Sequence, residues 1–97
     1  MRLLLIFCSS SIVEDIMSIL DKKAVSCYMN ISDVKGVAGE MRRLGTILFP
    51  GTADVILTAD TEDKLVEVMK DLEGYIGKCD FKVCFKAMIL KIEKAYF

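Results

Sequence analysis

The hydrophobic pattern of this chain predicts strands and two amphipathic helices. Residues 3–8 are apolar at every position, too short for a helix and followed by three serines, which is typical of a strand covered on both faces. Residues 25–32 alternate apolar with polar side chains, which indicates a strand with one drier face. Strands are expected at residues 3–8, 25–32, 53–59 and 81–85, with 87–92 as a continuation of the last or a short extra strand.

The two helices follow the first and third strands. Residues 11–23 carry apolar side chains at helical spacing, Ser11 and Glu14 form a capping-box pattern, and two lysines suit the C-terminus. The second helix has Thr61 as its cap, with acidic residues after it, and is expected to end between Gly74 and Gly77. Its buried face is marked by Leu65, Met69, Leu72 and Ile76.

Residues 49–51, Phe-Pro-Gly, form a predicted corner in the middle of the chain, because proline fixes φ and glycine tolerates a tight turn. The segment 35–44 before it has little periodicity and is predicted as a loop between two strands. The order is therefore β-α-β, loop, β-α-β, which is the ferredoxin-like arrangement of an α+β fold. It predicts an antiparallel sheet with both helices on one face.

This architecture leaves the other face of the sheet open, yet residues 3–8 and 55–57 do not alternate. Each leucine-sized side chain contributes roughly 1.5–3 kcal/mol on full burial, so a small domain tolerates such exposure poorly. We therefore expect a homo-oligomer that packs through the helix-free face, with cyclic symmetry and either two or three subunits.

Length and composition set further bounds. The 97 residues make one domain, residues 1–97, and 13 basic against 14 acidic side chains give no reason to expect nucleic-acid binding. No apolar run approaches the ~20 residues of a membrane span, and the N-terminus lacks a convincing cleavage site, so we expect a cytoplasmic protein without membrane insertion. The four cysteines (Cys8, Cys27, Cys79 and Cys84) are interpreted as free thiols that behave as small hydrophobes.

Three segments carry a resemblance to a known family. Residues 1–8 (MRLLLIFC), 44–52 (LGTILFPGT) and 85–94 (FKAMILKIEK) resemble the short PII-like proteins, relatives of the PII nitrogen regulatory proteins, and the similarity spans nearly the whole chain. The resemblance implies a homotrimer that binds adenine nucleotides between subunits and engages a partner protein through the loop after the second strand. Here that loop is short and has no tyrosine, so its covalent modification is not expected.

An anion site needs backbone N–H groups at glycines and one or two cations. Two segments supply such residues and could meet across a subunit boundary: Arg42, Arg43, Gly45 and Thr46 in one, and Gly77 and Lys78 in the other. In the alternative interpretation the arginines form a solvated pair and the glycines serve turns. The loop that would contact a partner contains Lys35, Gly36, Gly39 and Glu40.

Neither a metal site nor a catalytic site is expected. The chain has no histidine, so a zinc site would have to combine Cys79 and Cys84 with other thiols or carboxylates. Cys8, just ahead of the first helix, is the nearest thing to a nucleophile and is interpreted as structural. The leading hypothesis is a non-enzymatic PII-like homotrimer that needs no cofactor and senses a small anion such as an adenine nucleotide. The alternative is a CutA-like metal-binding trimer of the same fold.

Overall fold

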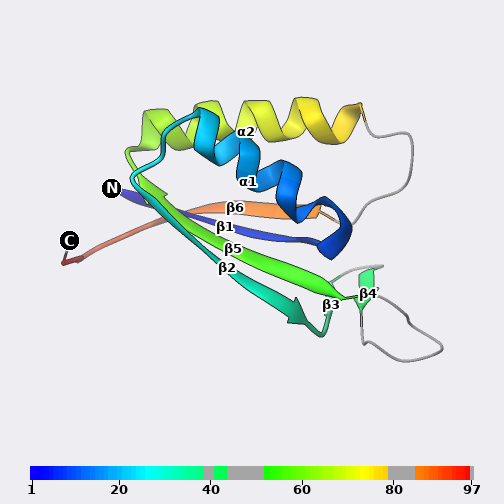
Figure 1. Cartoon of the computed structure of the whole chain (residues 1–97). Helices are drawn as coiled ribbons and strands as arrows, with labels where there is room; N and C mark the ends of the chain where they lie inside the picture. Colours follow the sequence, from blue (N-terminus) through cyan, green and yellow to red (C-terminus); the bar gives the residue numbers. More distant parts are fainter. Residues whose placement is uncertain (39–40, 44–51, 79–84, 97) are drawn as a thin grey trace.

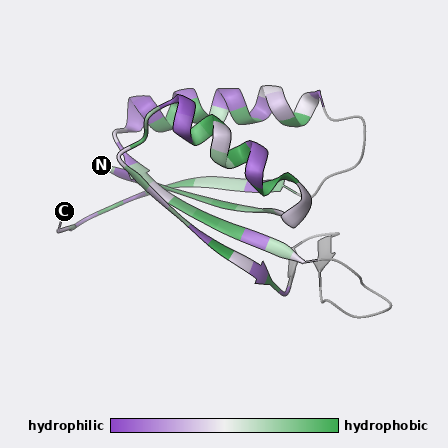
Figure 2. Ribbon diagram, viewed as in Figure 1, coloured by the Kyte–Doolittle hydropathy of each residue, from purple (hydrophilic) through white to green (hydrophobic). Residues whose placement is uncertain are grey.

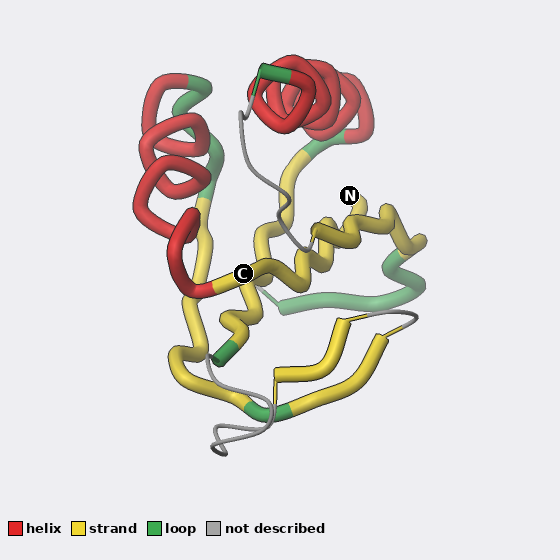
Figure 3. The backbone as a smooth tube through the Cα atoms, turned by 90° about the vertical axis from the view of Figure 1, so that its right-hand side faces the viewer, coloured by secondary structure: helices red, strands yellow, loops and turns green. Residues whose placement is uncertain are grey.

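The computed structural model of the chain describes residues 1–38, 41–43, 52–78 and 85–96, and it confirms the α+β prediction. A four-stranded antiparallel sheet has the order β2-β5-β1-β6. Both helices lie on one face of this sheet (Figures 1 and 3). The elements of this two-layer unit are β1 (Arg2–Ser9), α1 (Val13–Lys22), β2 (Cys27–Val34), β5 (Ala53–Asp60), α2 (Glu62–Gly77) and β6 (Phe85–Lys91). This is the strand order of the ferredoxin-like arrangement.

The predicted N-terminal cap is confirmed for α2 and is wrong for α1. Thr61 caps α2 as predicted, because its side chain accepts a hydrogen bond from the Lys64 backbone N–H at 3.4 Å. The capping box predicted at Ser11 is wrong. Ser11 lies in a short 3₁₀ helix (Ser10–Ile12), and α1 begins after Ile12 without a side-chain cap. At the other end α2 continues to Gly77, the C-terminal limit of the predicted range.

The core lies between the sheet and the helices. Side chains from both layers meet there and are at most 1% exposed: Leu4, Ile6, Cys8, Ile12, Ile16, Leu20, Ile56, Leu65, Val68 and Leu72. Met69 and Ile76 pack against this cluster and are partly buried, so the predicted buried face of α2 is confirmed.

The apolar row of β2 faces away from the helices. Met29 pairs with Leu57 of β5, and Leu57 pairs with Leu5 of β1, so all three lie on the side opposite the core residues Leu4 and Ile6. The row predicted to be drier is therefore the exposed row of the single chain. The polar row of β2 faces the helical side instead, where it meets a buried carboxylate described below.

The helix-free side of the sheet, which we call the open face, carries mostly apolar side chains, and the strands are largely coloured as hydrophobic in Figure 2. In the three rows that cross β1 at Leu3, Leu5 and Phe7, twelve positions belong to it by register: Leu3, Leu5, Phe7, Cys27, Met29, Ile31, Val55, Leu57, Ala59, Lys86, Met88 and Leu90. Lys86 is the one charged residue among them. The next row on this side, Ser9 and Ala53, is buried in the single chain. Four large apolar side chains of the open face are substantially exposed: Met29 by 71%, Ile31 by 49%, Leu90 by 43% and Met88 by 40%.

The prediction of a plain loop at 35–44 is wrong, because this segment contains a small antiparallel hairpin. β3 (Gly36–Ala38) pairs with β4 (Met41–Arg43), with Gly36 opposite Arg43. Each strand has three residues, too few for a period to be visible in the sequence. The Phe-Pro-Gly corner and the beginning of the predicted last strand at 81–84 lie outside the described residues.

Candidate functional site

Those predicted ligand-binding residues that the structure describes lie at one end of the molecule. Arg42 and Arg43 belong to β4, while Gly77 ends α2 and Lys78 follows it. The hairpin extends beyond the end of the sheet, and α2 ends in the helical layer at that same end (Figure 1). Within one chain Lys78 lines a groove between the two helices rather than the hairpin. The predicted meeting of the two segments across a subunit boundary stays a prediction.

The predicted partner loop coincides with the hairpin. Lys35 joins β2 to β3, and Gly36 is the first residue of β3. Gly39 and Glu40, together with Gly45 and Thr46 of the predicted anion site, lie outside the described residues. The described part of this segment is thus an ordered two-stranded element attached directly to the end of β2.

A polar network lies under the root of this hairpin, where β1 and β2 end and β5 begins. Its centre is Asp54, which is only 2% exposed. One carboxylate oxygen of Asp54 accepts a hydrogen bond from Ser10 Oγ at 2.5 Å, and the other accepts one from Asn30 Nδ2 at 3.0 Å. The Asp33 backbone N–H adds a longer contact of 3.4 Å. Three segments distant in sequence are thereby joined at one carboxylate.

The network keeps Asp54 ionised. Burial alone would raise its pKa, but the hydrogen bonds from Ser10 and Asn30, with further ones from Asp33 and Ser32, outweigh that effect. The pKa of Asp54 therefore lies below its ordinary value, since donors to a carboxylate favour the charged form. A buried carboxylate that has several donors is a firm anchor, because breaking it leaves polar groups unpaired.

The backbone of β2 bends at the same place. The pairing of β2 with β5 shifts register between Ile31 and Val34, and Asp33 adopts a left-handed conformation with φ 56°. Aspartate tolerates this region better than most residues do. The Asp33 side chain accepts a hydrogen bond from Thr52 Oγ1 at 3.1 Å, so the bend is tied to the residue that precedes β5. Bend and network together set the direction in which the hairpin leaves the sheet.

Cys8 borders the network and has the character of a core residue. Its side chain is 0% exposed, and its thiol lies 3.8 Å from the backbone oxygen of Asp54. Burial, reinforced by the negative charge of Asp54, raises the pKa of Cys8 to about 12. Because the thiolate is the reactive form, the burial and the raised pKa support the interpretation of Cys8 as a structural residue.

Sequence reasoning missed most of this network. Asp54 was visible as a carboxylate inside an otherwise apolar strand, and Asn30 as a member of the polar row of β2. The contributions of Ser10, Asp33 and Thr52 depend on contacts between residues as far as 44 positions apart, which no local pattern reveals.

Other chemistry is sparse in the described residues. Within them, no group of three cysteine, aspartate or glutamate side chains could hold a metal ion. Cys8 and Cys27 are free thiols, and Cys79 and Cys84 lie outside the described residues. None of the helices described is long and apolar enough to cross a membrane.

Comparison with known proteins identifies the architecture. No protein-family model matches the chain, and no curated protein matches it in sequence. Its structure is similar to that of CPII, a nitrogen regulatory PII-like protein from Thiomonas intermedia K12 bound to ADP, AMP and bicarbonate. The TM-score is 0.69 at 13% identity, over 96% of this chain and 88% of CPII.

A second similar structure is a protein from Thermus thermophilus that is described as PII-like and signalling. Its TM-score is 0.64 at 13% identity, over 92% of this chain and 85% of that one. The apo form of CPII is also similar, with a TM-score of 0.61 and 13% identity over 92% of this chain and 89% of the other. The chain therefore has the fold of the PII-like proteins.

Proposed function

We propose that this protein is a PII-like regulator that senses a small anionic ligand and signals to a partner protein. The observation that carries the proposal is the similarity to CPII over 96% of the chain, in a structure that holds ADP, AMP and bicarbonate. An adenine nucleotide is accordingly the first ligand to test. The protein acts by binding rather than by catalysis and works in the cytoplasm.

The proposed assembly is a homotrimer formed through the open face. The twelve named positions of this face are apolar except Lys86, and Met29 and Ile31 are about half exposed or more in the single chain. Packing of neighbouring sheets covers these side chains and stabilises the assembly. The same packing brings the hairpin of one subunit near the α2 end of another, which is where the ligand cleft is proposed.

In the proposed mechanism, ligand charge is neutralised by Arg42 and Arg43 from the hairpin and by Lys78 from α2. Gly45, Thr46 and Gly77 supply backbone N–H groups to the anion. Binding then fixes the segment 35–44 in one conformation that a partner protein recognises, through Lys35, Gly36, Gly39 and Glu40. The Asp54 network supports this role because it holds the hairpin root in place.

Isothermal titration of the full chain with ADP, AMP, ATP and bicarbonate tests the ligand. We expect saturable heat with at least one nucleotide, and its loss in Arg42→Ala/Arg43→Ala and in Lys78→Ala. Lys91→Ala/Lys94→Ala removes two charges as the arginine pair does, Lys94→Ala removes one as Lys78→Ala does, and both should bind as the unaltered protein does. No heat and no thermal shift at millimolar ligand would remove the nucleotide from the proposal.

None of the comparisons favours the CutA-like alternative. Metal analysis of the purified protein distinguishes the two functions. Stoichiometric metal that is lost on replacing Cys79 or Cys84 would support the metal-binding trimer instead.

A further inference from the structure

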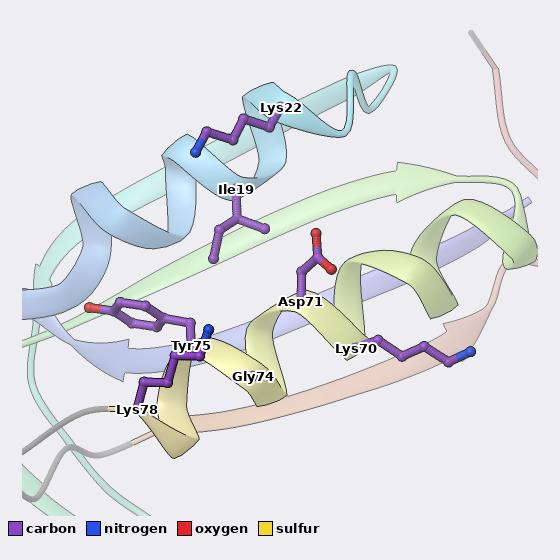
Figure 4. A pocket seen from close by; sticks show the side chains of 7 residues that line it. All are labelled: Ile19, Lys22, Lys70, Asp71, Gly74, Tyr75 and Lys78. Carbon is purple, nitrogen blue, oxygen red and sulfur yellow. The ribbon is translucent and has the colours of Figure 1, made fainter.

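A groove of about 400 Å³ lies between α1 and α2 on the outer side of the helical layer. Its floor contains Ile19 from α1 and Tyr75 from α2, both partly buried, and lysines stand around it (Figure 4). The tyrosine is fixed in place because its hydroxyl donates a hydrogen bond to Asp15 of α1 at 2.6 Å. The groove thus has a preorganised aromatic and aliphatic floor.

The groove is basic although the whole chain has a formal net charge of −1. Lys22 approaches it from α1 and Lys78 from α2, while Lys70 extends along α2 at the other end (Figure 4). No carboxylate among the described residues forms an ion pair with these three lysines. The one acidic side chain in the groove, Asp71, is neutralised by Lys23 at 3.3 Å. Lys22, Lys70 and Lys78 are therefore left without a described ion-pair partner around the floor, while the Asp15 carboxylate is engaged by the Tyr75 hydroxyl.

Gly74 keeps the middle of the groove open. It lies inside α2, where glycine is less favourable than alanine, and an added Cβ would meet no atom within 4 Å. Packing within the chain therefore does not require glycine at this position. A side chain here would project into the groove, so its absence maintains the space.

We propose that this groove is a docking site for an acidic segment of a partner protein. An apolar side chain of that segment packs on Ile19 and Tyr75, and its carboxylates contact Lys22, Lys70 and Lys78. An apolar centre with a charged rim is the usual organisation of a protein interface. A small molecule fits less well, because small-molecule sites bury most of their ligand, and this groove is an open trough between exposed side chains.

The proposed docking site shares Lys78 with the ligand site of the proposed function, and its other residues belong to the groove alone. The helical layer lies on the opposite side of the sheet from the open face, so the groove stays accessible when copies of the chain cover that face (Figure 1). Charge reversal at Lys22 and Lys70 leaves Lys78, Arg42 and Arg43 unchanged. Titration of the Lys22→Glu/Lys70→Glu variant with ADP therefore distinguishes the two proposals, because only peptide binding should be lost.

The test titrates the full chain with a synthetic peptide of repeated Glu-Leu-Glu-Phe units and monitors the chemical shifts of the protein by NMR. We expect shift changes confined to the residues around the groove and a saturable affinity. Lys22→Glu/Lys70→Glu should weaken binding by about tenfold or more, since attraction becomes repulsion. The matched control Lys91→Glu/Lys94→Glu changes the same charge elsewhere and should bind as the unaltered protein does.

A second variant tests the apolar floor. Gly74→Leu fills the groove with a residue that favours helix, so the fold is retained, and it should also weaken binding about tenfold. Ala95→Leu places the same side chain on the exposed C-terminal tail and should have no effect. Absence of binding at millimolar peptide, equal binding by polyglutamate, or unchanged affinity in the groove variants would each overturn the proposal.

Discussion

Replacing Asp54 by alanine tests the anchoring role of the polar network. The substitution removes the acceptor for Ser10 Oγ at 2.5 Å and for Asn30 Nδ2 at 3.0 Å, together with the longer contact to the Asp33 N–H. It also removes the one charge at the centre of the network. We expect the fold to survive, because Asp54 lies outside the apolar core cluster.

The cost follows from these contacts. A hydrogen bond to a charged group contributes about 1.5–3 kcal/mol, so the two short ones give a gross loss of about 3–6 kcal/mol. Part of this free energy is recovered in the variant, because Ser10 can donate a hydrogen bond to Thr52 Oγ1 at 2.8 Å. Asn30 also keeps its hydrogen bond to the Val55 carbonyl at 3.3 Å. We therefore expect a net loss of about 2–3 kcal/mol in the free energy of unfolding.

Chemical denaturation at one fixed protein concentration measures this loss, with Asp63→Ala as the control. Asp63 is an exposed carboxylate in the first turn of α2, and its removal should cost about 0.5 kcal/mol. Amide hydrogen exchange should also become faster at the root of the hairpin in Asp54→Ala. A loss below about 0.5 kcal/mol, or exchange that stays unchanged, would refute the anchoring role.

Three further predictions concern other parts of the chain. Like Asp54, Asp60 has a lowered pKa, because hydrogen bonds from Thr61 and Ser26 outweigh the effect of burial. Both carboxylates therefore stabilise the fold at pH values above their ordinary pKa of 3.8, and this stabilisation is lost as the pH falls through their pKa in the folded state. Denaturation between pH 7 and about pH 3 should show this fall, and Asp60→Asn should make it shallower. Ala24→Gly should add about 0.5–1 kcal/mol of stability in the same assay, because Ala24 has φ 51° after the end of α1, and a decrease would count against this interpretation. Met29→Glu should dissociate the assembly in sedimentation, whereas Val66→Glu, on the helical layer and 40% exposed, should leave it intact. Met29 is 71% exposed in the single chain, so its burial in the proposed trimer would contribute about 1–2 kcal/mol, and a carboxylate buried there would add a penalty of several kcal/mol.

Local pattern was sufficient for the two-layer fold. The second helix was predictable because Thr61 caps it and Leu65, Leu72 and their neighbours keep a helical spacing. The open face was predictable in outline, because β1 is apolar at consecutive positions while one layer of helices covers one side only. Which face of β2 lies toward the helices was not predictable. Alternation alone marks its apolar row as the buried one, yet Asn30 turns toward the helical side because Asp54 of the neighbouring strand accepts from it.

The candidate site was less predictable for the same reason. Its hydrogen bonds join residues that are 24 and 44 positions apart, so they exist only once β1, β2 and β5 are side by side. The hairpin escaped detection because each strand has three residues and pairs only with its partner. The start of α1 was misplaced because Ser10 donates to Asp54 across the fold and no serine caps the helix locally.

If copies of this chain cover each other's open faces, the mass of the particle in dilute buffer must be a multiple of the subunit mass. Multi-angle light scattering of the full chain at micromolar concentration should give three times the 10.9 kDa subunit mass, about 33 kDa. A stable particle of 10.9 kDa would contradict the account, since the apolar open face would then stand in water and the proposed clefts between subunits would not exist.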